Sequence, residues 1–233
     1  QIGDIINPPN VIPNNIGVLF SGDIRLNALI NSGTSRITLG IISDNYFVGL
    51  PSLRLKEPAE FLTASSQVEV LFIPLLIWEK LIAENKAFSK TINGIFTTSE
   101  LWHLLSNEKL NLPYPENPKE LRKYIKNILR VIKIFNFYPG KSTLKEIDNK
   151  KFNWLIRDGN IKNIEKFEVI SKDNFSQIIE SIEEEITLIG FPVALWSNIE
   201  TEETIEEKIR DISPSKLKQK SEKVLVQSNS EKV

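Results

Sequence analysis

The residue types that carry most enzyme chemistry are scarce in this chain of 233 residues. It has no cysteine, no methionine and one histidine, His103. Without cysteine there is no thiolate nucleophile, no disulfide and no cysteine-bound zinc. General acid–base catalysis by His103 would need a nucleophile or carboxylate partner, which the sequence does not identify. We therefore expect His103 to have a structural or surface role.

The acidic runs 183–185 and 202–203 are the other candidates for acid–base chemistry. Neighbouring residues of a helix point in different directions, so adjacent acids are usually solvated rather than paired across a site. The glycines are too scattered for a phosphate-binding loop and fit turns instead. We expect no catalytic residue, no metal and no cofactor, and interpret the chain as a binding or regulatory module rather than an enzyme.

A basic segment, 119–133, is the best candidate for a contact with nucleic acid. It carries six lysines and arginines around an apolar stripe, but the chain as a whole has a net charge of −1. A transcription activator of the helix-turn-helix type would need a recognition helix after this segment, whereas Pro139-Gly140 and strand-like sequence follow it. We expect these cations to solvate an amphipathic helix and predict no nucleic-acid partner.

The chain opens on Gln1 and contains no methionine, so we expect it to be a piece of a longer polypeptide. No apolar run reaches the ~18 residues that a membrane-spanning helix requires, and the start lacks the order of a signal peptide. We expect a soluble piece in the cytoplasm with no direct membrane span.

The elements that must position any site begin with short apolar runs separated by turn residues. Such spacing is typical of an all-β roll, either a barrel or a jelly roll. The runs are 16–20, 23–30, 36–42, 60–65 and 68–73.

From Pro74 the apolar period changes from two to about 3.6, which predicts helices. The first has an apolar stripe of Leu75, Ile77, Trp78, Leu81 and Ile82. We expect Trp78, like Trp102 and Trp154, to pack in the core. Further helices are predicted over 88–96, over 98–105 with Thr98 or Ser99 as its cap, and over 118–135.

Strand-like sequence returns in 152–159 and 165–170, and 174–185 has a helical pattern. In this second half a glycine-containing strand start is followed by an apolar hairpin, and the first half has the same two features in the same order. The second half is therefore predicted to be a smaller, eroded β-roll. Residues 198–233 are charged and poor in apolar residues, which predicts a tail or linker.

Residues 16–82 resemble the cyclic nucleotide-binding domain of the Crp and protein-kinase-A regulatory type. The matching segments are Gly3-Asp-Ile-Ile, Val18-Leu-Phe-Ser-Gly-Asp-Ile-Arg-Leu, Ile37-Thr-Leu-Gly and Thr63 to Pro74. This resemblance implies a β-roll with a ligand cassette between its later strands.

In that family the cassette carries F-G-E, whose glutamate accepts the ribose hydroxyl, and P-R-[ST]-A, whose arginine pairs with the phosphate. Here the first motif reads Phe47-Val-Gly-Leu50, and the arginine position falls on Pro58 or Ala59. Arg54 and Glu60 are nearby but match neither role, so we predict loss of cyclic-nucleotide affinity. The candidate ligand-binding residues of this degenerate cassette are Phe47, Gly49, Leu50, Arg54, Pro58 and Ala59.

The later segments 139–148, 152–161 and 188–192 are similar to the N-terminal extension of cyanobacterial ABC exporters of the peptidase-containing, double-glycine leader type. This resemblance implies a regulatory or docking module on the cytoplasmic side of a peptide or bacteriocin exporter. Its partners would be the rest of the exporter polypeptide or the peptide substrate. A homodimer through the helix at 74–85 or 118–135 is a further expectation.

Two other hypotheses remain open. One is a Crp-family transcription regulator without a recognisable DNA-binding part. The other is a small-ligand sensor, which a closed pocket lined by Leu50, Leu53 and Phe61 would favour. In every case the predicted fold class is α+β. A β-roll with helices over 1–110 is followed by a long helix and second α+β unit over 111–197, and by the tail.

Overall fold

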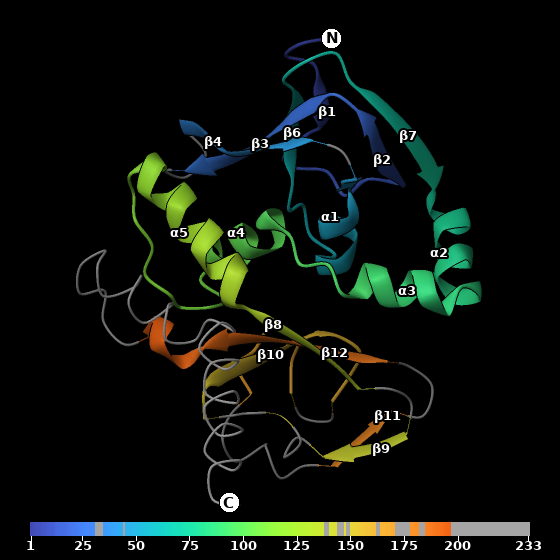
Figure 1. The fold of residues 1–233 in the computed structure, drawn as a ribbon, viewed down its shortest axis with the longest axis vertical. Coiled ribbons are helices and arrows are strands. Elements are labelled where there is room, and N and C mark those ends of the chain that lie inside the picture. Colours follow the sequence, from blue (N-terminus) through green and yellow to red (C-terminus); the bar gives the residue numbers. More distant parts are fainter. Residues whose placement is uncertain are drawn as a thin grey trace, which may run out of the picture.

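Two antiparallel sheets form the first part of the chain (Figure 1). The computed structural model describes residues 1–30, 35–43, 45–137, 140–143, 147, 150–161, 164–170, 178–181 and 185–196. One sheet has the order β1 (Ile5–Asn7), β6 (Phe61–Ala64), β3 (Asp23–Ile30), β4 (Ser35–Ser43). The other has the order β5 (Phe47–Val48), β2 (Asn15–Ser21), β7 (Glu69–Pro74). All five predicted apolar runs are strands.

The strands form here because their apolar residues alternate. On β3, Ile24, Leu26 and Ala28 are almost fully buried, whereas Arg25 faces solvent. Gly22 turns the chain between β2 and β3 at a φ of 86°, and a Cβ there would lie 2.1 Å from the Gln67 carbonyl oxygen. A residue with a side chain therefore does not fit this turn.

Five helices complete the described first half and its link to the second. They are α1 (Leu50–Leu55), α2 (Leu75–Glu84), α3 (Lys86–Asn93), α4 (Thr98–Ser106) and α5 (Pro118–Val131). The predicted core roles of Trp78, Trp102 and Trp154 are confirmed, since each is at most 8 % exposed. None of the described helices has both the length and the apolarity that a membrane crossing requires.

Two details of these helices differ from prediction. The cap of α4 is Thr97, not Thr98 or Ser99. Its hydroxyl accepts from the Glu100 amide while the Glu100 carboxylate accepts from the Thr97 amide, a reciprocal capping box. Helix α5 ends at Val131 rather than 135, because Lys133 to Phe137 pair with a strand of the second half.

The second half contains a three-stranded antiparallel sheet. Its order is β10 (Phe152–Asp158), β12 (Ile186–Pro192), β8 (Lys133–Phe137), and a short 3-10 helix, Val193–Trp196, follows β12. A separate pair joins β9 (Gly140–Thr143) to β11 (Ile178–Ser181). The fold is thus α+β, with a β-roll, helices and a smaller β unit. The two sheets of the roll do not close into a barrel among the described residues.

The helix predicted over 174–185 is wrong at 178–181, which is strand β11. Pairing with β9 and the β-branched Ile178 and Ile179 favour a strand there, and 171–177 and 182–184 lie outside the described residues. The strand predicted over 165–170 is reduced to single bridges at Lys166 and Val169.

One apolar cluster runs through both halves of the described chain. Leu155, Ile189 and Phe191 of the second sheet belong to the same cluster as Leu104 of α4 and Ile128 of α5. Figure 1 shows α4 and α5 between the roll and this sheet. The division at 110 and 111 stays a prediction, and any boundary there would cut through a continuous core. The predicted tail, 198–233, lies outside the described residues.

Candidate functional site

The cassette begins at the turn between β5 and α1, where Gly49 is required. Its φ is 88°, and a Cβ there would lie 2.6 Å from Cγ of Pro13. Phe47, just before it, places its ring centroid 5.5 Å from that of Trp78, and Leu50 is 4 % exposed in the same apolar cluster. Phe47 and Leu50 are therefore core residues of the roll.

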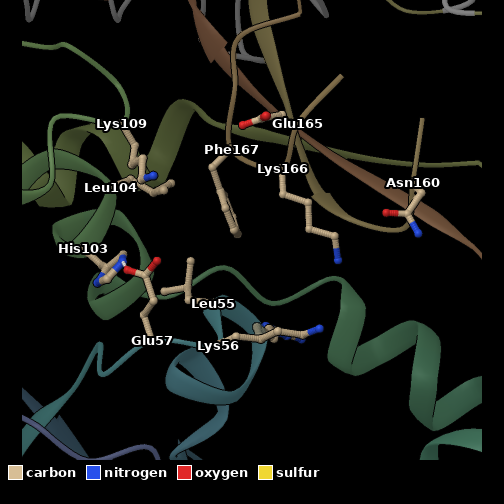
Figure 2. Close-up of a pocket in the computed structure, with 11 residues that line it drawn as sticks. Leu55, Lys56, Glu57, His103, Leu104, Lys109, Asn160, Glu165, Lys166 and Phe167 are labelled. Carbon is tan, nitrogen blue, oxygen red and sulfur yellow. Dashed lines mark ion pairs between the residues drawn. The ribbon is translucent and has the colours of Figure 1, made fainter. Parts of the chain in front are cut away.

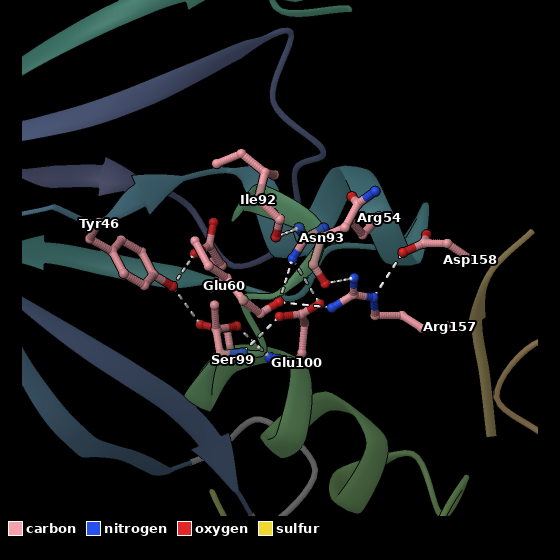
Figure 3. Close-up of polar contacts among 11 residues, drawn as sticks. Tyr46, Arg54, Glu60, Ile92, Asn93, Ser99, Glu100, Arg157 and Asp158 are labelled. Atoms are coloured by element: carbon pink, nitrogen blue, oxygen red, sulfur yellow. Dashed lines mark hydrogen bonds and ion pairs between the residues drawn. The ribbon is translucent and has the colours of Figure 1, made fainter. Parts of the chain in front are cut away.

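Glu60 occupies the interior beside this turn, a role the sequence analysis missed. Its side chain is buried and accepts hydrogen bonds from the Gly49 amide and the Tyr46 hydroxyl, each at 2.5 Å, and Figure 3 shows the contact with Tyr46. The Tyr46 oxygen also lies 3.0 Å from the Ser99 hydroxyl of α4. Burial raises the pKa of Glu60 to about 8, although both hydrogen bonds oppose that shift. Burial and the nearby Glu60 carboxylate together raise the pKa of Tyr46 well above its ordinary value.

Arg54 is the positive partner on the other side of the same network. Its guanidinium donates to the carbonyls of Ile95, at 2.9 Å, and Ile92, and it lies 3.4 Å from the Glu100 carboxylate. Its side chain is 8 % exposed, and this burial lowers the Arg54 pKa while Glu100 opposes the shift. The Arg54 guanidinium therefore holds the segment between α3 and α4 through these protein contacts.

Pro58 and Ala59 stand where the resemblance places the phosphate-binding arginine. The Ala59 amide donates to the Ser52 hydroxyl at 3.0 Å, which ties this loop to α1. Both residues line a cavity of about 150 Å³ together with Glu60 and Phe61. Ligand pockets usually measure about 300 to 1,000 Å³, so this space is small for a nucleotide. Leu50 and Leu53, predicted to line a sensor pocket with Phe61, pack instead against Ile16.

Arg157 reaches the same helix connection from the second half. It is fully buried on β10, donates to the Ile95 carbonyl at 2.8 Å and to the Asn93 carbonyl, and pairs with Asp158 at 2.8 Å. Arg54 of α1 and Arg157 of β10 thus both donate to the Ile95 carbonyl, and Figure 3 shows the two side chains together. The sequence could have predicted this role, because Arg157 follows the largely apolar run Phe-Asn-Trp-Leu-Ile and a buried cation needs partners.

His103 has the carboxylate partner that the sequence could not identify. Its Nε2 lies 2.9 Å from the Glu57 carboxylate, and the Asn107 amide is also within hydrogen-bond distance. Burial lowers the His103 pKa, and Glu57 opposes this. The Ser106 hydroxyl donates to the His103 backbone carbonyl at 3.4 Å. The arrangement anchors the loop after α1 to α4 and supplies no nucleophile.

The described residues contain no group of three or more metal-ligating side chains. A second, larger cavity of about 530 Å³ lies beside the His103 and Glu57 pair, and Figure 2 shows its lining. It is formed by loops from both halves of the chain, so no local pattern in the sequence marks it.

Comparison with known proteins gives solved structures only. No family model and no curated protein matches the chain. A transcriptional regulator from Thermotoga maritima is 15 % identical over 47 % of this chain and 84 % of its own, with a TM-score of 0.38. The catabolite activator protein of Thermus thermophilus is 18 % identical over 48 % of each chain, with a TM-score of 0.34. The structure of cAMP-bound PfPKA-R is 12 % identical over 98 % of this chain and 79 % of its own, with a TM-score of 0.38. Sequence identities and TM-scores this low give no information about what the site binds.

Proposed function

We propose that this chain is a non-enzymatic regulatory and docking module of a peptide-exporting ABC transporter, on its cytoplasmic side, and that it does not bind cyclic nucleotides. The exporter context is supported by the motif resemblance in the second half. The transcription-regulator hypothesis has less support, because α5 is followed by strand β8 rather than by a recognition helix.

The observation that carries the proposal is the self-occupied cassette. Both ionisable side chains near it, Arg54 and Glu60, are buried and already bonded to groups of the protein. A cyclic phosphate would need a charge-assisted donor, and neither Pro58 nor Ala59 carries one. A ligand that entered the interior would have to expose Glu60 and break its hydrogen bonds to the Gly49 amide and the Tyr46 hydroxyl. The space offers no charged donor that would compensate for these losses.

The docking role is supported by apolar side chains on the outside of β7 and α2. Leu76 is 81 % exposed, and Leu71, Phe72 and Ile77 are each at least half exposed. Exposed apolar side chains that gather on neighbouring elements are typical of interaction surfaces. Its partner, in this proposal, is the apolar part of the exporter's peptide substrate.

Titration calorimetry with cAMP and cGMP tests the cassette. We expect no heat of binding up to millimolar nucleotide, and micromolar binding of either would overturn this half of the proposal.

Fluorescence anisotropy with a labelled double-glycine leader peptide tests the docking surface. We expect saturable binding that is lost in Leu76→Asp, since this side chain is exposed and its replacement leaves the core intact. Lys119→Asp, at the first turn of α5 where an acid is favourable, is the matched control and should bind like the wild type. Equal binding by both variants would contradict the assignment of this surface.

A further inference from the structure

The larger cavity carries an unbalanced positive charge that the proposed function does not use. Its volume is about 530 Å³, and three lysines line it: Lys56, Lys109 and Lys166. They come from three separate segments, the end of α1, the connection from α4 to α5, and the connection from β10 to β12. None of the three makes an ion pair or side-chain hydrogen bond with another described residue.

Two carboxylates, Glu57 and Glu165, also line the cavity, so the lysines outnumber the acids by three to two. Glu57 lies 2.9 Å from His103, and Arg54, the fourth cation of the lining, is engaged by Glu100 and two carbonyls. Figure 2 shows the Lys166 ammonium pointing toward Lys56, whereas the Glu165 carboxylate points away from both. The chain as a whole carries a net charge of −1, so this is a local concentration of cations. The excess of lysines over carboxylates leaves this concave site net positive, and such a site attracts anions.

The loop that carries Lys166 is held in an unusual backbone conformation. Phe167 has a φ of 63°, which is rare for a bulky residue, and its amide donates to the Ile156 carbonyl at 2.8 Å. Lys56 also has a positive φ, 55°, at the end of α1, where its amide donates to the Ser52 carbonyl. Such conformations persist only where surrounding contacts impose them, and they concentrate at binding sites. Lys56, Lys166 and Phe167 all line the same cavity.

We propose that this cavity binds a small molecule with a diphosphate group, of the nucleoside diphosphate class. Lys56 and Lys166 supply donors for the phosphate oxygens, and Lys109 adds positive charge to the same lining; an ammonium group is a common phosphate ligand as a point charge. The Phe167 ring, which lines the same cavity, offers a face on which a base can stack. The volume lies within the usual range for small-molecule sites, about 300 to 1,000 Å³. Of the candidate cassette residues only Arg54 lines this cavity, and the site is independent of the exporter proposal.

Titration calorimetry at low salt, with pyrophosphate and with ADP as probes, tests the site. We expect both to bind, and binding to weaken as salt is raised. Lys166→Ala and Lys56→Ala should each weaken both probes about tenfold, the effect expected for loss of one charged hydrogen bond. These lysines are exposed, so the variants should unfold at the wild-type temperature.

Two further variants separate the alternatives. Phe167→Leu should weaken ADP and leave pyrophosphate unchanged, because only ADP has a base to stack. Lys126→Ala, on the exposed side of α5 and outside the cavity, should bind both probes like the wild type. The proposal is overturned if the wild type binds neither probe at millimolar concentration. It is also overturned if Lys126→Ala loses as much affinity as Lys166→Ala, which would indicate diffuse attraction to the surface.

Discussion

The buried Glu60 should make the stability of this protein fall as pH rises, the reverse of the usual behaviour of a carboxylate. Its pKa is raised from 4.5 to about 8 because its side chain is removed from water. Between these two values the folded protein holds a proton on Glu60 that the unfolded chain has released. The free energy of unfolding must therefore decrease with rising pH across this window.

The size of the effect follows from the two pKa values. One pH unit of difference corresponds to about 1.4 kcal/mol, so the full window of about 3.5 units is worth roughly 5 kcal/mol. Below about pH 4.5 both states are protonated and Glu60 adds no pH dependence. Above pH 8 the buried carboxylate is charged in the folded protein, and this contribution to stability has been lost.

The variant Glu60→Gln isolates this contribution. A glutamine side chain can still accept a hydrogen bond from the Gly49 amide and form one with the Tyr46 hydroxyl, but it has no titratable proton. Urea unfolding followed by tryptophan fluorescence, from pH 4 to 9, gives the free energy of unfolding of each protein. The advantage of the wild type over Glu60→Gln should shrink by several kcal/mol across this range, with a limiting slope of about 1.4 kcal/mol per pH unit.

The exposed Glu79 of α2 provides the control, because Glu79→Gln should keep the pH profile of the wild type. If the difference between wild type and Glu60→Gln were constant from pH 5 to 8, Glu60 would not be protonated in the folded state. Burial would then not raise the pKa of Glu60.

Two other substitutions test how the cassette and the second half are held. Arg157→Met leaves the Asn93 and Ile95 carbonyls without this donor, and we expect a loss of about 3 kcal/mol in urea unfolding. The exposed Arg130→Met should change little, and an equal loss in both would argue against a special role for Arg157. Gly49→Ala should cost at least about 2 kcal/mol, because it combines a positive φ with a contact to Pro13. Gly40→Ala, which meets nothing within 4 Å, should stay within about 0.5 kcal/mol of the wild type, and similar losses at both glycines would contradict the steric argument.

Much of the architecture was predictable because it depends on local patterns. The apolar run 23–30, bounded by turn residues, predicted strand β3, and the stripe of Leu121, Ile125 and Ile128 predicted helix α5. These periods report which face of an element is buried, and burial is what stabilises the element. The same patterns misplaced the end of α5 and the state of residues 178–181, where pairing with a distant strand overrides local preference.

The candidate site was predictable only by exclusion. The motif Phe47-Val-Gly-Leu50 and the absence of arginine at Pro58 and Ala59 predicted that the cassette lacks its phosphate ligand. The sequence could not indicate that Glu60 would turn inward to Gly49 and Tyr46. Nor could it indicate that His103 would meet Glu57, because each of these contacts joins residues that lie more than ten positions apart.

Sequence alone therefore determined the element types, the turn glycines and the absence of cysteine chemistry, since each depends on residue identity or short spacing. Tertiary structure decided which charged groups are buried, which partners they find and where cations remain unpaired. Arg54 and Arg157 share the Ile95 carbonyl, and Lys56, Lys109 and Lys166 share one cavity, only because packing of the core brings distant segments together. The energy of a charge depends on its surroundings, and those surroundings exist only once the chain has folded.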